Sequence, residues 1–493
     1  MMRYLIAVVC GALLPLSFAP FSLWPLGLVS AAGWFYLLEK RATSGLMEGW
    51  LFGVGKYGVG ASWIYVSIHV YGNAPVVLAV FLVALFVAGM ALFPMLNAWL
   101  YRRLRGASLL TNAWLFTVLW VGFEWLLIWF LTGFPWLQAG YAHLDTPLAN
   151  LAPVGGVLLV SLAAVASASF AIAGYYAEDK RLPLTFALLP WLIAGGLSPF
   201  QWVDSKGEDR EAALVQGNID QAVKWLPESR GPIIDKYLAL SEPHWGVDLM
   251  LWPEAAITLF EHQAADVLAE LDARGRASGT AVVLGLPGLE RMADGKLAFR
   301  NLALGVGEAS GRYVKQHLVP FGEYIPLERW LRGIIEVFDL PLSNSEPGSP
   351  KQPLIAVNGA MAAMAICYEV IYPELVREQA RRADLLLTIS NDTWFGESIG
   401  PIQHMEMARM RALENGRWLL RGTNNGITAI VDHRGRVRHR LPQFSAGVLR
   451  GRYQLMTGQT PFARFGQLPV LLLGLLSVVA FVWRQSKKQT AQG

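Results

Sequence analysis

The first 200 residues are almost continuously apolar, broken only by short polar islands. This pattern constrains the fold strongly, because a helix needs about 20 apolar residues to cross the hydrocarbon core of a bilayer. The pattern returns in "QLPVLLLGLLSVVAFVW" (467–483), which precedes the basic tail "RQSKKQ". The sequence therefore predicts a chain built around membrane-spanning helices.

Eight apolar segments are predicted to span the membrane. They lie near residues 4–20, 23–38, 49–69, 75–99, 110–131, 154–176, 183–200 and 467–483. Basic residues fall on alternate connections between these segments, namely Arg3, Lys40, Arg41, Arg102, Arg103, Arg105, Lys180, Arg181, Arg484, Lys487 and Lys488. Connections rich in Lys and Arg stay in the cytoplasm. Both termini are therefore predicted to be cytoplasmic, and residues 203–465 extracytoplasmic.

The chain divides by composition into three parts. Residues 1–202 form a predicted membrane domain with seven spans, and residues 466–493 hold the last span and a cytoplasmic tail. Between them, residues 203–465 alternate apolar strand patterns with helix patterns, which is typical of a layered α/β domain. Overall, 54% hydrophobic and 16% charged residues make the chain too apolar for an ordinary soluble protein.

Charge and cysteine content exclude several classes of protein. The formal net charge is only +4 and the basic residues are scattered, which disfavours nucleic-acid binding. The two cysteines, Cys10 and Cys367, are too far apart in sequence to suggest a disulfide framework. Since no CxxC, HExxH or clustered His and Cys residues occur, we expect no metal and no other cofactor.

Local patterns predict the elements of the α/β region. Helices are expected near 228–242, 262–278, 373–382 and 402–416, with a strand hairpin turned at Ala309–Gly311. Two ionisable residues, Lys56 and Glu124, fall inside predicted spans. Such residues contact substrate or relay protons in many membrane proteins, or else they lie near an interface or pair with polar neighbours. Both interpretations remain open for this pair.

Three apolar strands of the α/β region end on potentially reactive side chains. Glu254 follows "LMLWP", Lys315 follows "GRYV" and Cys367 follows "AMAI". Ligands bind at the carboxyl ends of strands in α/β sheets. A carboxylate can take the proton of a thiol, and a lysine can stabilise both the thiolate and an oxyanion. Singly, each residue also has a purely structural explanation: a helix N-terminal charge, an exposed strand residue and a small buried hydrophobe.

The sequence around these residues resembles the motifs of a known superfamily. "LWPEAAI", "YVKQHLVPFGEYIP" and "AICYEVIYPELV" are similar, in this chain order, to the Glu, Lys and Cys motifs of the nitrilase, or carbon–nitrogen hydrolase, superfamily. With "VQGNIDQAVKW", the long "ISNDTWFGES…" stretch and eight spans, nearly the whole chain resembles the bacterial apolipoprotein N-acyltransferase family. The resemblance implies a nitrilase-like αββα sandwich inserted into a polytopic α-helical membrane domain of about eight spans.

The resemblance also implies roles for individual residues. It makes Glu254 the general base, Lys315 the oxyanion-stabilising residue and Cys367 the nucleophile. Further residues match positions that the family needs for activity: Trp225, Glu323, Tyr368 and Glu369. Asn301 is expected either to orient a catalytic group or to cap a turn. Trp394 and Phe395 are expected on a mobile loop or in ordinary loop packing, and they join "IEVFDLPL" (335–342) as candidates for excluding water.

The implied activity is transfer of a phospholipid sn-1 acyl chain, through a Cys thioester, to a lipoprotein. The acceptor would be the α-amine of a diacylglyceryl-modified N-terminal cysteine, and the preferred donor phosphatidylethanolamine. The enzyme would be a monomer in the bacterial inner membrane, with its catalytic domain in the periplasm. One alternative is a membrane-anchored nitrilase-type amidase, although a single anchor would then suffice. The other is a transporter with a binding domain, for which the expected paired charges and broken repeat helices are not found.

A reporter fused after residue 300 tests the predicted topology. The distribution of basic residues places this position outside the cytoplasm, so an export-dependent reporter such as alkaline phosphatase should be active there. The same reporter fused after residue 180 should be inactive. Activity at residue 180 and not at residue 300 would contradict the predicted orientation.

Overall fold

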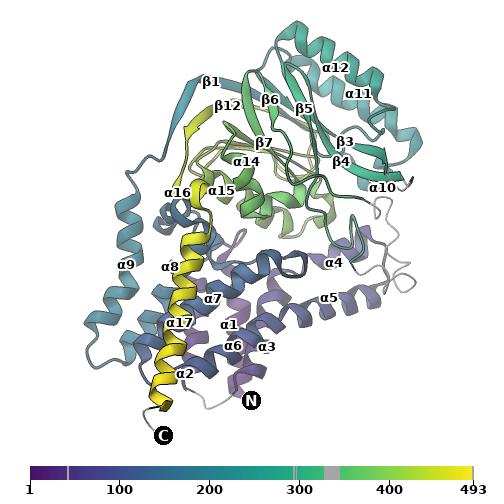
Figure 1. The fold of residues 1–493 in the computed structure, drawn as a ribbon. Coiled ribbons are helices and arrows are strands. Elements are labelled where there is room, and N and C mark those ends of the chain that lie inside the picture. The colour runs from purple at the N-terminus through teal and green to yellow at the C-terminus, as the bar shows by residue number, and fades with distance from the viewer. Residues whose placement is uncertain (41–43, 293–294, 296, 327–344, 491–493) are drawn as a thin grey trace. The chain divides into compact units, whose positions relative to one another are not determined.

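The computed structural model describes residues 1–40, 44–292, 295, 297–326 and 345–490 of the chain. The candidate segment 335–342 therefore lies outside the described residues. Contacts divide the chain into a helical unit and an α/β unit (Figure 1). The helical unit comprises Met1–Tyr65, Pro75–Gln201 and Arg464–Gly493, and the α/β unit comprises Val66–Ala74 and Trp202–Ala463.

The helical unit contains nine long helices among the described residues. They are α1 (Met2–Leu13), α2 (Trp24–Lys40), α3 (Leu46–Gly60), α5 (Val76–Met90), α6 (Leu92–Leu104), α7 (Leu109–Trp129), α8 (Ala152–Tyr176), α9 (Arg181–Leu197) and α17 (Leu468–Thr490). Helix α3 ends well before residue 69, where the predicted span ends. The short α4 (Ile64–Val66) and the turn η2 (Ser67–Tyr71) follow it.

Three helical stretches of the described chain are long and apolar enough to cross a membrane. They are Val76–Leu104, Leu109–Thr132 and Pro147–Tyr176. Three shorter apolar helices accompany them, Met2–Ser17, Arg181–Leu197 and Leu468–Trp483. The N-terminal region is thus helical with three candidate membrane spans, whereas the total of eight spans stays a prediction.

Glycines allow α1 and α3 to pack closely. A Cβ atom on Gly11 would lie 2.0 Å from the carbonyl oxygen of Phe52, and one on Gly55 would lie 2.2 Å from that of Val8. These separations are far below van der Waals contact, so neither position accepts a larger residue without moving the backbone. Close approach through small residues is a common way for helices to associate in membranes.

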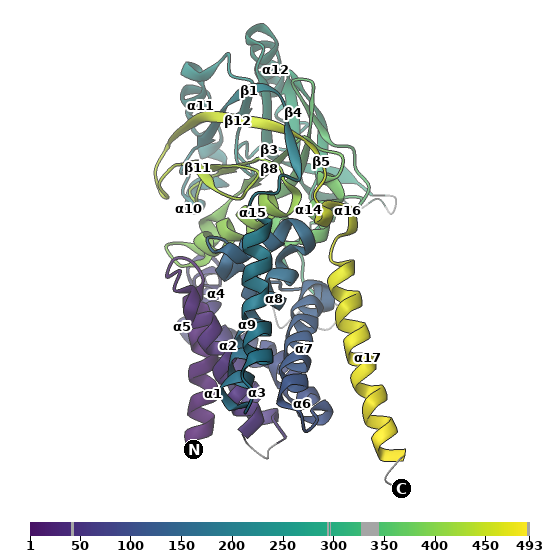
Figure 2. The same cartoon turned by 90° about the vertical axis from the view of Figure 1, so that its left-hand side faces the viewer.

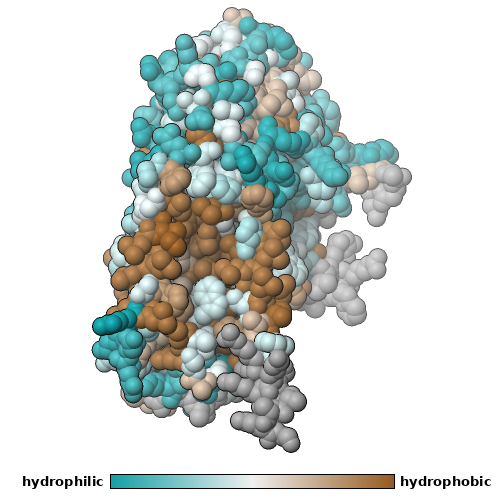
Figure 3. All heavy atoms as spheres, turned by 60° about the vertical axis from the view of Figure 1, so that its left-hand side comes forward, coloured by the Kyte–Doolittle hydropathy of each residue, from teal (hydrophilic) through white to brown (hydrophobic). Residues whose placement is uncertain are grey.

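The surface of the helical unit is strongly apolar. Figure 3 shows a broad hydrophobic area on this unit, and the exposed side chains of α9 and α17 include Leu192 at 71% and Leu476 at 66%. A contiguous apolar surface of this kind marks contact with a membrane or a partner in a folded protein. In contrast, the surface of the α/β unit in the same view is mostly polar.

The two ionisable residues of the predicted spans are buried in the helical unit. Lys56 is 5% exposed and Glu124 is 2% exposed. The Glu124 Oε1 atom accepts hydrogen bonds from the Trp120 indole N–H (2.8 Å) and the Ala139 backbone N–H (2.7 Å). The Lys56 Nζ atom lies 6.0 Å from the centre of the Trp120 ring. For Glu124, the interpretation as a residue paired with polar neighbours therefore agrees with the structure.

Twelve strands form a single continuous sheet in the described part of the α/β unit, in the order β11-β10-β9-β8-β7-β6-β5-β4-β3-β2-β1-β12. The strands are β1 (Val203–Gln216), β2 (Leu249–Leu251), β3 (Ala281–Arg291), β4 (Leu297–Gly307), β5 (Ala309–Val314), β6 (Ile355–Val357), β7 (Ala360–Ile366), β8 (Leu385–Ser390), β9 (Leu419–Thr423), β10 (Ala429–Val431), β11 (Val437–Arg440) and β12 (Gly447–Gly458). Two sets of neighbours are parallel, β1-β2-β3 and β7-β8-β9.

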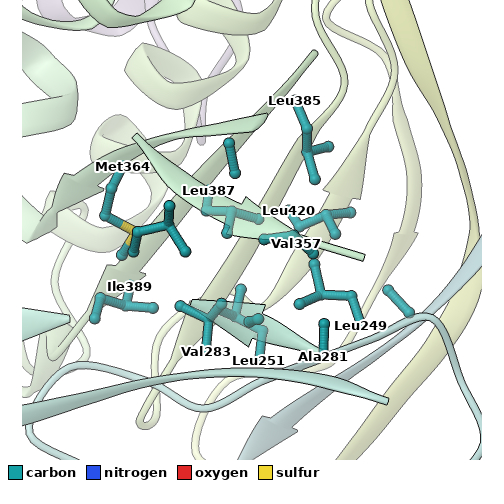
Figure 4. Packing of buried hydrophobic residues seen from close by; sticks show 14 of the residues in the cluster. Leu249, Leu251, Ala281, Val283, Val357, Met364, Leu385, Leu387, Ile389 and Leu420 are labelled. Carbon is teal, nitrogen blue, oxygen red and sulfur yellow. The ribbon is translucent and has the colours of Figure 1, made fainter. Parts of the chain in front are cut away.

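Alternation along the strands produces two apolar cores. Leu249 and Leu251 of β2 point into a core shared with Leu385, Leu387 and Ile389 of β8, which Figure 4 shows between the two halves of the sheet. Their neighbours on the opposite face of β2 belong to a second core, shared with helices α11 (Arg230–Ser241) and α12 (Ala265–Ser278). Because successive side chains of a strand point to opposite faces, this half of the sheet is buried on both sides.

Helices lie outside both halves of the sheet. In Figures 1 and 2, α11 and α12 lie over the half that contains β3 and β4, while α14 (Pro373–Ala380) and α15 (Gly400–Asn415) lie beyond β7 on the opposite side. The short helices α10 (Gln221–Lys224) and α16 (Pro461–Phe465) are further described elements. The unit thus has helices, two sheet halves and helices in succession.

Two local expectations differ from the structure. The hairpin between β4 and β5 turns at Glu308, directly after Gly307 with φ +70°, so the predicted turn at Ala309–Gly311 is wrong. Gly311 instead pairs with Gly305 within the ladder. In addition, β12 pairs with β1 along most of its length. No strand is predicted from the sequence at 447–458, although polar and apolar residues alternate there.

The Leu387→Ala substitution tests the core between the sheet halves. Leu387 is 1% exposed there, so truncation should lower the free energy of unfolding by about 2–5 kcal/mol. Leu297→Ala is the matched control, because Leu297 is 55% exposed on β4. Thermal unfolding of the full chain in detergent should give a lower Tm only for Leu387→Ala. Equal Tm values would contradict this assignment of the core.

Candidate active site

Four strands end at the candidate site. Glu254 follows β2, Lys315 follows β5, Cys367 follows β7 and Asn391 follows β8. The parallel pairing of β7 with β8 aligns Ile366 with Ile389, so the residues after both strands emerge at the same edge. Ion pairs and hydrogen bonds then connect the residues after β2, β5 and β8, which are distant in sequence.

The Lys315 ammonium lies between two carboxylates. Its Nζ atom is 2.8 Å from Glu323 Oε1 and 3.5 Å from Glu254 Oε1, and the side chain is 1% exposed. Burial alone would lower the pKa of Lys315, but the charges of Glu323 and Glu254 outweigh it and hold that pKa above its ordinary value. The lysine therefore carries a permanent positive charge in a water-poor site.

Donors fix both oxygens of the Glu254 carboxylate. Its Oε1 accepts from Asn301 Nδ2 at 2.7 Å, and its Oε2 accepts from the Asn391 backbone N–H at 2.8 Å. The same Asn301 nitrogen lies 3.2 Å from Glu323 Oε1. Asn301 is in the middle of β4, paired with Pro287, so it caps no turn and contacts both carboxylates. Glu254 is thus held in one orientation.

Cys367 stands at a strained turn. It begins the turn η9 (Cys367–Ile371) with φ +53°, the left-handed region that residues other than glycine rarely adopt. Cys367 as a whole residue is partly exposed. Burial raises the pKa of Cys367, and the charge of Glu254 acts in the same direction, while Lys315 opposes them. The thiol is therefore protonated at neutral pH and needs a base before it can act as a nucleophile.

Glu369 joins the lysine segment to the cysteine turn. This fully buried carboxylate accepts hydrogen bonds from the backbone N–H groups of Gln316 (2.5 Å), His317 (3.1 Å) and Ile366 (2.7 Å). The Tyr313 hydroxyl donates a further one at 3.0 Å. Burial raises the pKa of Glu369 to about 7, although the three backbone N–H donors and the charge of Lys315 act in the opposite direction. The arrangement fixes the segments that carry Lys315 and Cys367 relative to each other.

The remaining predicted residues lie around these groups. Tyr368 is buried with its ring 5.4 Å from that of Tyr372. Trp225 follows α10 directly after Lys224 and is partly exposed. Trp394 and Phe395 belong to the turn η10 (Asp392–Phe395) and are also partly exposed.

The turn η10 is held by the segment Val66–Ala74, which belongs to the same unit. The Ser67 hydroxyl donates to the Trp394 carbonyl at 2.8 Å, and the Tyr71 ring lies 5.9 Å from the Trp394 ring, edge to face. The structure thus places Trp394 in a packed turn, whereas the sequence left open whether it is on a mobile loop.

Sequence reasoning missed several polar groups at the site. Lys224 is 1% exposed, and its Nζ donates to the Glu254 carbonyl at 3.3 Å. Burial lowers the pKa of Lys224 to about 8, with Glu254 opposing. Asn391 supplies the N–H to Glu254, and a buried group of Asp392, His404 and Arg421 lies behind Cys367. Only Asn391 had a sequence signal, because it directly follows an apolar strand.

In the described chain, no group of three or more His, Cys, Asp or Glu side chains is arranged to hold a metal ion.

Two family profiles match the chain. One, described as carbon–nitrogen hydrolase, covers residues 211–460, and the other, described as the apolipoprotein N-acyltransferase N-terminal domain, covers residues 10–170. The α/β unit, with a cysteine, a lysine and a glutamate at its strand ends, is therefore a domain of the carbon–nitrogen hydrolase class.

Solved structures that resemble it include a CN-hydrolase superfamily protein from Xanthomonas campestris (19% identity, TM-score 0.37, covering 50% of this chain and 91% of that one). An amidase from Nesterenkonia sp. is similar at 20% identity and TM-score 0.37, covering 55% of this chain and 97% of that one.

Full-length relatives narrow the assignment. Apolipoprotein N-acyltransferases from Pseudomonas aeruginosa and Azotobacter vinelandii are each 44% identical over 99% of this chain, covering 97% and 96% of those proteins. The enzyme from Vibrio cholerae is 41% identical over 99% of this chain and 98% of its own length. The chain belongs to the apolipoprotein N-acyltransferase family.

The reactivity of the Cys367 thiol tests the electrostatics of the site. Because its pKa is raised, alkylation by iodoacetamide should be slow at pH 7 and should accelerate about tenfold per pH unit to at least pH 9. Mass spectrometry of the Cys367 peptide measures the rate, and Cys367→Ala defines the background. A rate that levels off below pH 8 would indicate a thiolate of low pKa and would contradict the electrostatic description.

Proposed function

We propose that this enzyme moves the sn-1 acyl chain of a phospholipid to the α-amine of a lipoprotein through a thioester on Cys367. The acceptor is the diacylglyceryl-modified N-terminal cysteine of the lipoprotein. The observation that supports this most directly is the set of Glu254, charged Lys315 and protonated Cys367, which follow strands β2, β5 and β7. These are the base, the electrostatic stabiliser and the nucleophile that acyl transfer requires.

In the first half-reaction Glu254 takes the proton of the Cys367 thiol. The sulfur attacks the ester carbonyl, and the bond between carbonyl carbon and sulfur forms. Lys315, together with the backbone N–H of Tyr368, stabilises the negative oxygen of the tetrahedral intermediate; donors of this type contribute about 3–4 kcal/mol each in comparable sites. The ester C–O bond then breaks, and Glu254 returns its proton to the departing lysophospholipid.

In the second half-reaction the lipoprotein amine attacks the thioester carbonyl. Glu254 accepts a proton from the amine as the C–N bond forms. The C–S bond then breaks, and Glu254 returns this proton to the sulfur, which restores the thiol of Cys367. An amide is more stable than a thioester, so the second half-reaction is downhill. Since one thiol serves both halves, the donor product leaves before the acceptor reacts, which is ping-pong kinetics.

The supporting residues have positioning roles in this proposal. Glu323 holds the Lys315 ammonium, Asn301 orients both carboxylates, and Glu369 fixes the segments that carry Lys315 and Cys367. Trp225 contacts an acyl chain. Trp394 and Phe395 exclude water, which would otherwise release the chain as a free fatty acid.

The lipid substrates explain why the catalytic domain is joined to membrane helices. Removing an acyl chain from the bilayer costs about 0.8 kcal/mol per CH₂. We propose an inner-membrane monomer with eight spans and cytoplasmic termini, in which the domain of residues 203–465 is periplasmic. In this proposal phosphatidylethanolamine is the preferred donor. The rival, a membrane-anchored amidase, uses the same three residues but needs only one anchor.

The thioester is the product that tests this proposal. Purified protein mixed with phosphatidylethanolamine should gain the mass of one acyl chain on Cys367, whereas Cys367→Ala should gain none and Cys367→Ser almost none. Glu254→Gln should slow acylation by roughly 10²- to 10⁴-fold, because it removes the general base. Glu270→Gln is the matched control, since this glutamate of α12 is 43% exposed in its side chain.

A second readout separates acyl transfer from hydrolysis. With a diacylglyceryl peptide present, the wild-type enzyme should form N-acylated peptide with little free fatty acid. Absence of acylation at Cys367, or a normal rate in Glu254→Gln, would refute the mechanism. Fatty acid released without N-acylated peptide would favour the amidase.

A further inference from the structure

A buried polar cluster lies directly behind the nucleophile. His404 of α15 is 1% exposed, and its Nε2 atom lies 3.2 Å from the backbone carbonyl oxygen of Cys367. Its Nδ1 atom lies 3.1 Å from Asp392 Oδ1 and 3.1 Å from Arg421 Nη2. Arg421 also donates to Asp392 Oδ2 at 2.7 Å, and both charged side chains are fully buried.

The direction of the hydrogen bond to Cys367 follows from chemistry. A backbone carbonyl oxygen can only accept, so the Nε2 atom of His404 must carry the proton and donate. This holds whether the imidazole is neutral or protonated. Burial and Arg421 lower the pKa of His404 although Asp392 opposes them, which favours the neutral ring with Arg421 donating to Nδ1. In both protonation states, the Nδ1 edge of the ring faces the Asp392–Arg421 pair, and the Nε2 edge faces the backbone carbonyl of Cys367.

The position of this carbonyl explains why it needs a donor. The ladder between β7 and β8 ends at Ile366 and Ile389, so the carbonyl of Cys367 lies beyond it. Cys367 also has φ +53°, a conformation that persists only where the surroundings impose it. A buried Asp–Arg pair is costly to place in a protein interior, and here it orients the ring that meets this carbonyl.

We infer that His404 is a positioning residue for the nucleophile: its Nε2–H holds the Cys367 carbonyl and keeps the strained turn in the geometry that aims the thiol. Asp392 and Arg421 orient the imidazole and take no part in proton transfer. The Phe395 ring lies 5.8 Å from that of His404, edge to face. The turn η10 therefore contacts the same ring that holds the nucleophile.

Two amide substitutions test this inference. In His404→Gln the side-chain amide nitrogen reaches about as far as Nε2 and can donate to the Cys367 carbonyl. In His404→Asn it ends at the place of Nδ1, one methylene short. His404→Asn should slow acylation of Cys367 by phosphatidylethanolamine on the order of 10²-fold, as expected for a misplaced reacting group, with the half-saturating phospholipid concentration unchanged. His404→Gln should stay within about tenfold of wild type.

The experiment uses the full chain in detergent, with Tm measured for both variants. Equal acylation rates for the two variants, whether both fast or both slow, would overturn the inference, because a purely structural role does not distinguish the two amides. The inference rests on the proposed function, so iodoacetamide alkylation of Cys367 provides a readout that needs no phospholipid. The same ranking is expected there. If that ranking appears while the wild-type enzyme takes up no acyl chain, the positioning role stands and the proposed reaction fails.

Discussion

The structure of the active site depends on the Lys315 ammonium held between Glu254 and Glu323. A buried positive charge is costly unless it is paired and hydrogen-bonded. Lys315 is only 1% exposed, so its ammonium needs negatively charged partners. The two ion pairs of Lys315 connect three segments that are separate in sequence: the ends of β2 and β5 and the turn that carries Glu323. Asn301 strengthens this group because one amide nitrogen contacts both carboxylates.

The charges of the site affect the pKa values of Lys315 and Cys367 in different ways. Lys315 stays protonated because two carboxylates face it, whereas Cys367 stays protonated because burial and Glu254 outweigh Lys315. The resting site therefore holds a thiol, and in the proposed mechanism the thiolate forms only when Glu254 acts as the base. A protonated thiol reacts slowly with small electrophiles that diffuse into the site. In the proposed function, this leaves Cys367 available for the ester of the lipid.

Two features of the chain match a lipid substrate independently. The helical unit exposes long apolar side chains over a wide area, and the family profile that matches residues 10–170 is described as the apolipoprotein N-acyltransferase N-terminal domain. The α/β unit supplies the chemistry of a carbon–nitrogen hydrolase. In the proposed function, this combination allows a reaction between two substrates that both carry acyl chains.

Much of the candidate site was predictable because three of its residues lie at or just beyond the ends of apolar strands. Glu254, Lys315 and Cys367 each carry that signal in their own sequence. The cluster of Asp392, His404 and Arg421 does not, since His404 lies within a helix and Arg421 within a strand. Their proximity depends on which strands pair and which helix packs behind them.

Boundaries in the fold were less predictable for similar reasons. The apolar run 49–69 reads as one span, yet α3 ends at Gly60 and Val66–Ala74 packs with the α/β unit. Apolar composition cannot tell lipid contact from contact with protein. The β4–β5 turn also lies earlier than expected, because Gly307, with its positive φ, precedes Glu308 at the turn.

The central claim is that the thiol which takes the acyl chain also delivers it. The most direct measurement is a single-turnover chase, in which acylated enzyme is freed of phospholipid and mixed with a diacylglyceryl peptide. The account predicts that acyl mass leaves Cys367 at the rate at which amide-linked acyl peptide appears, one for one. Peptide acylation while Cys367 keeps its acyl chain would contradict the account.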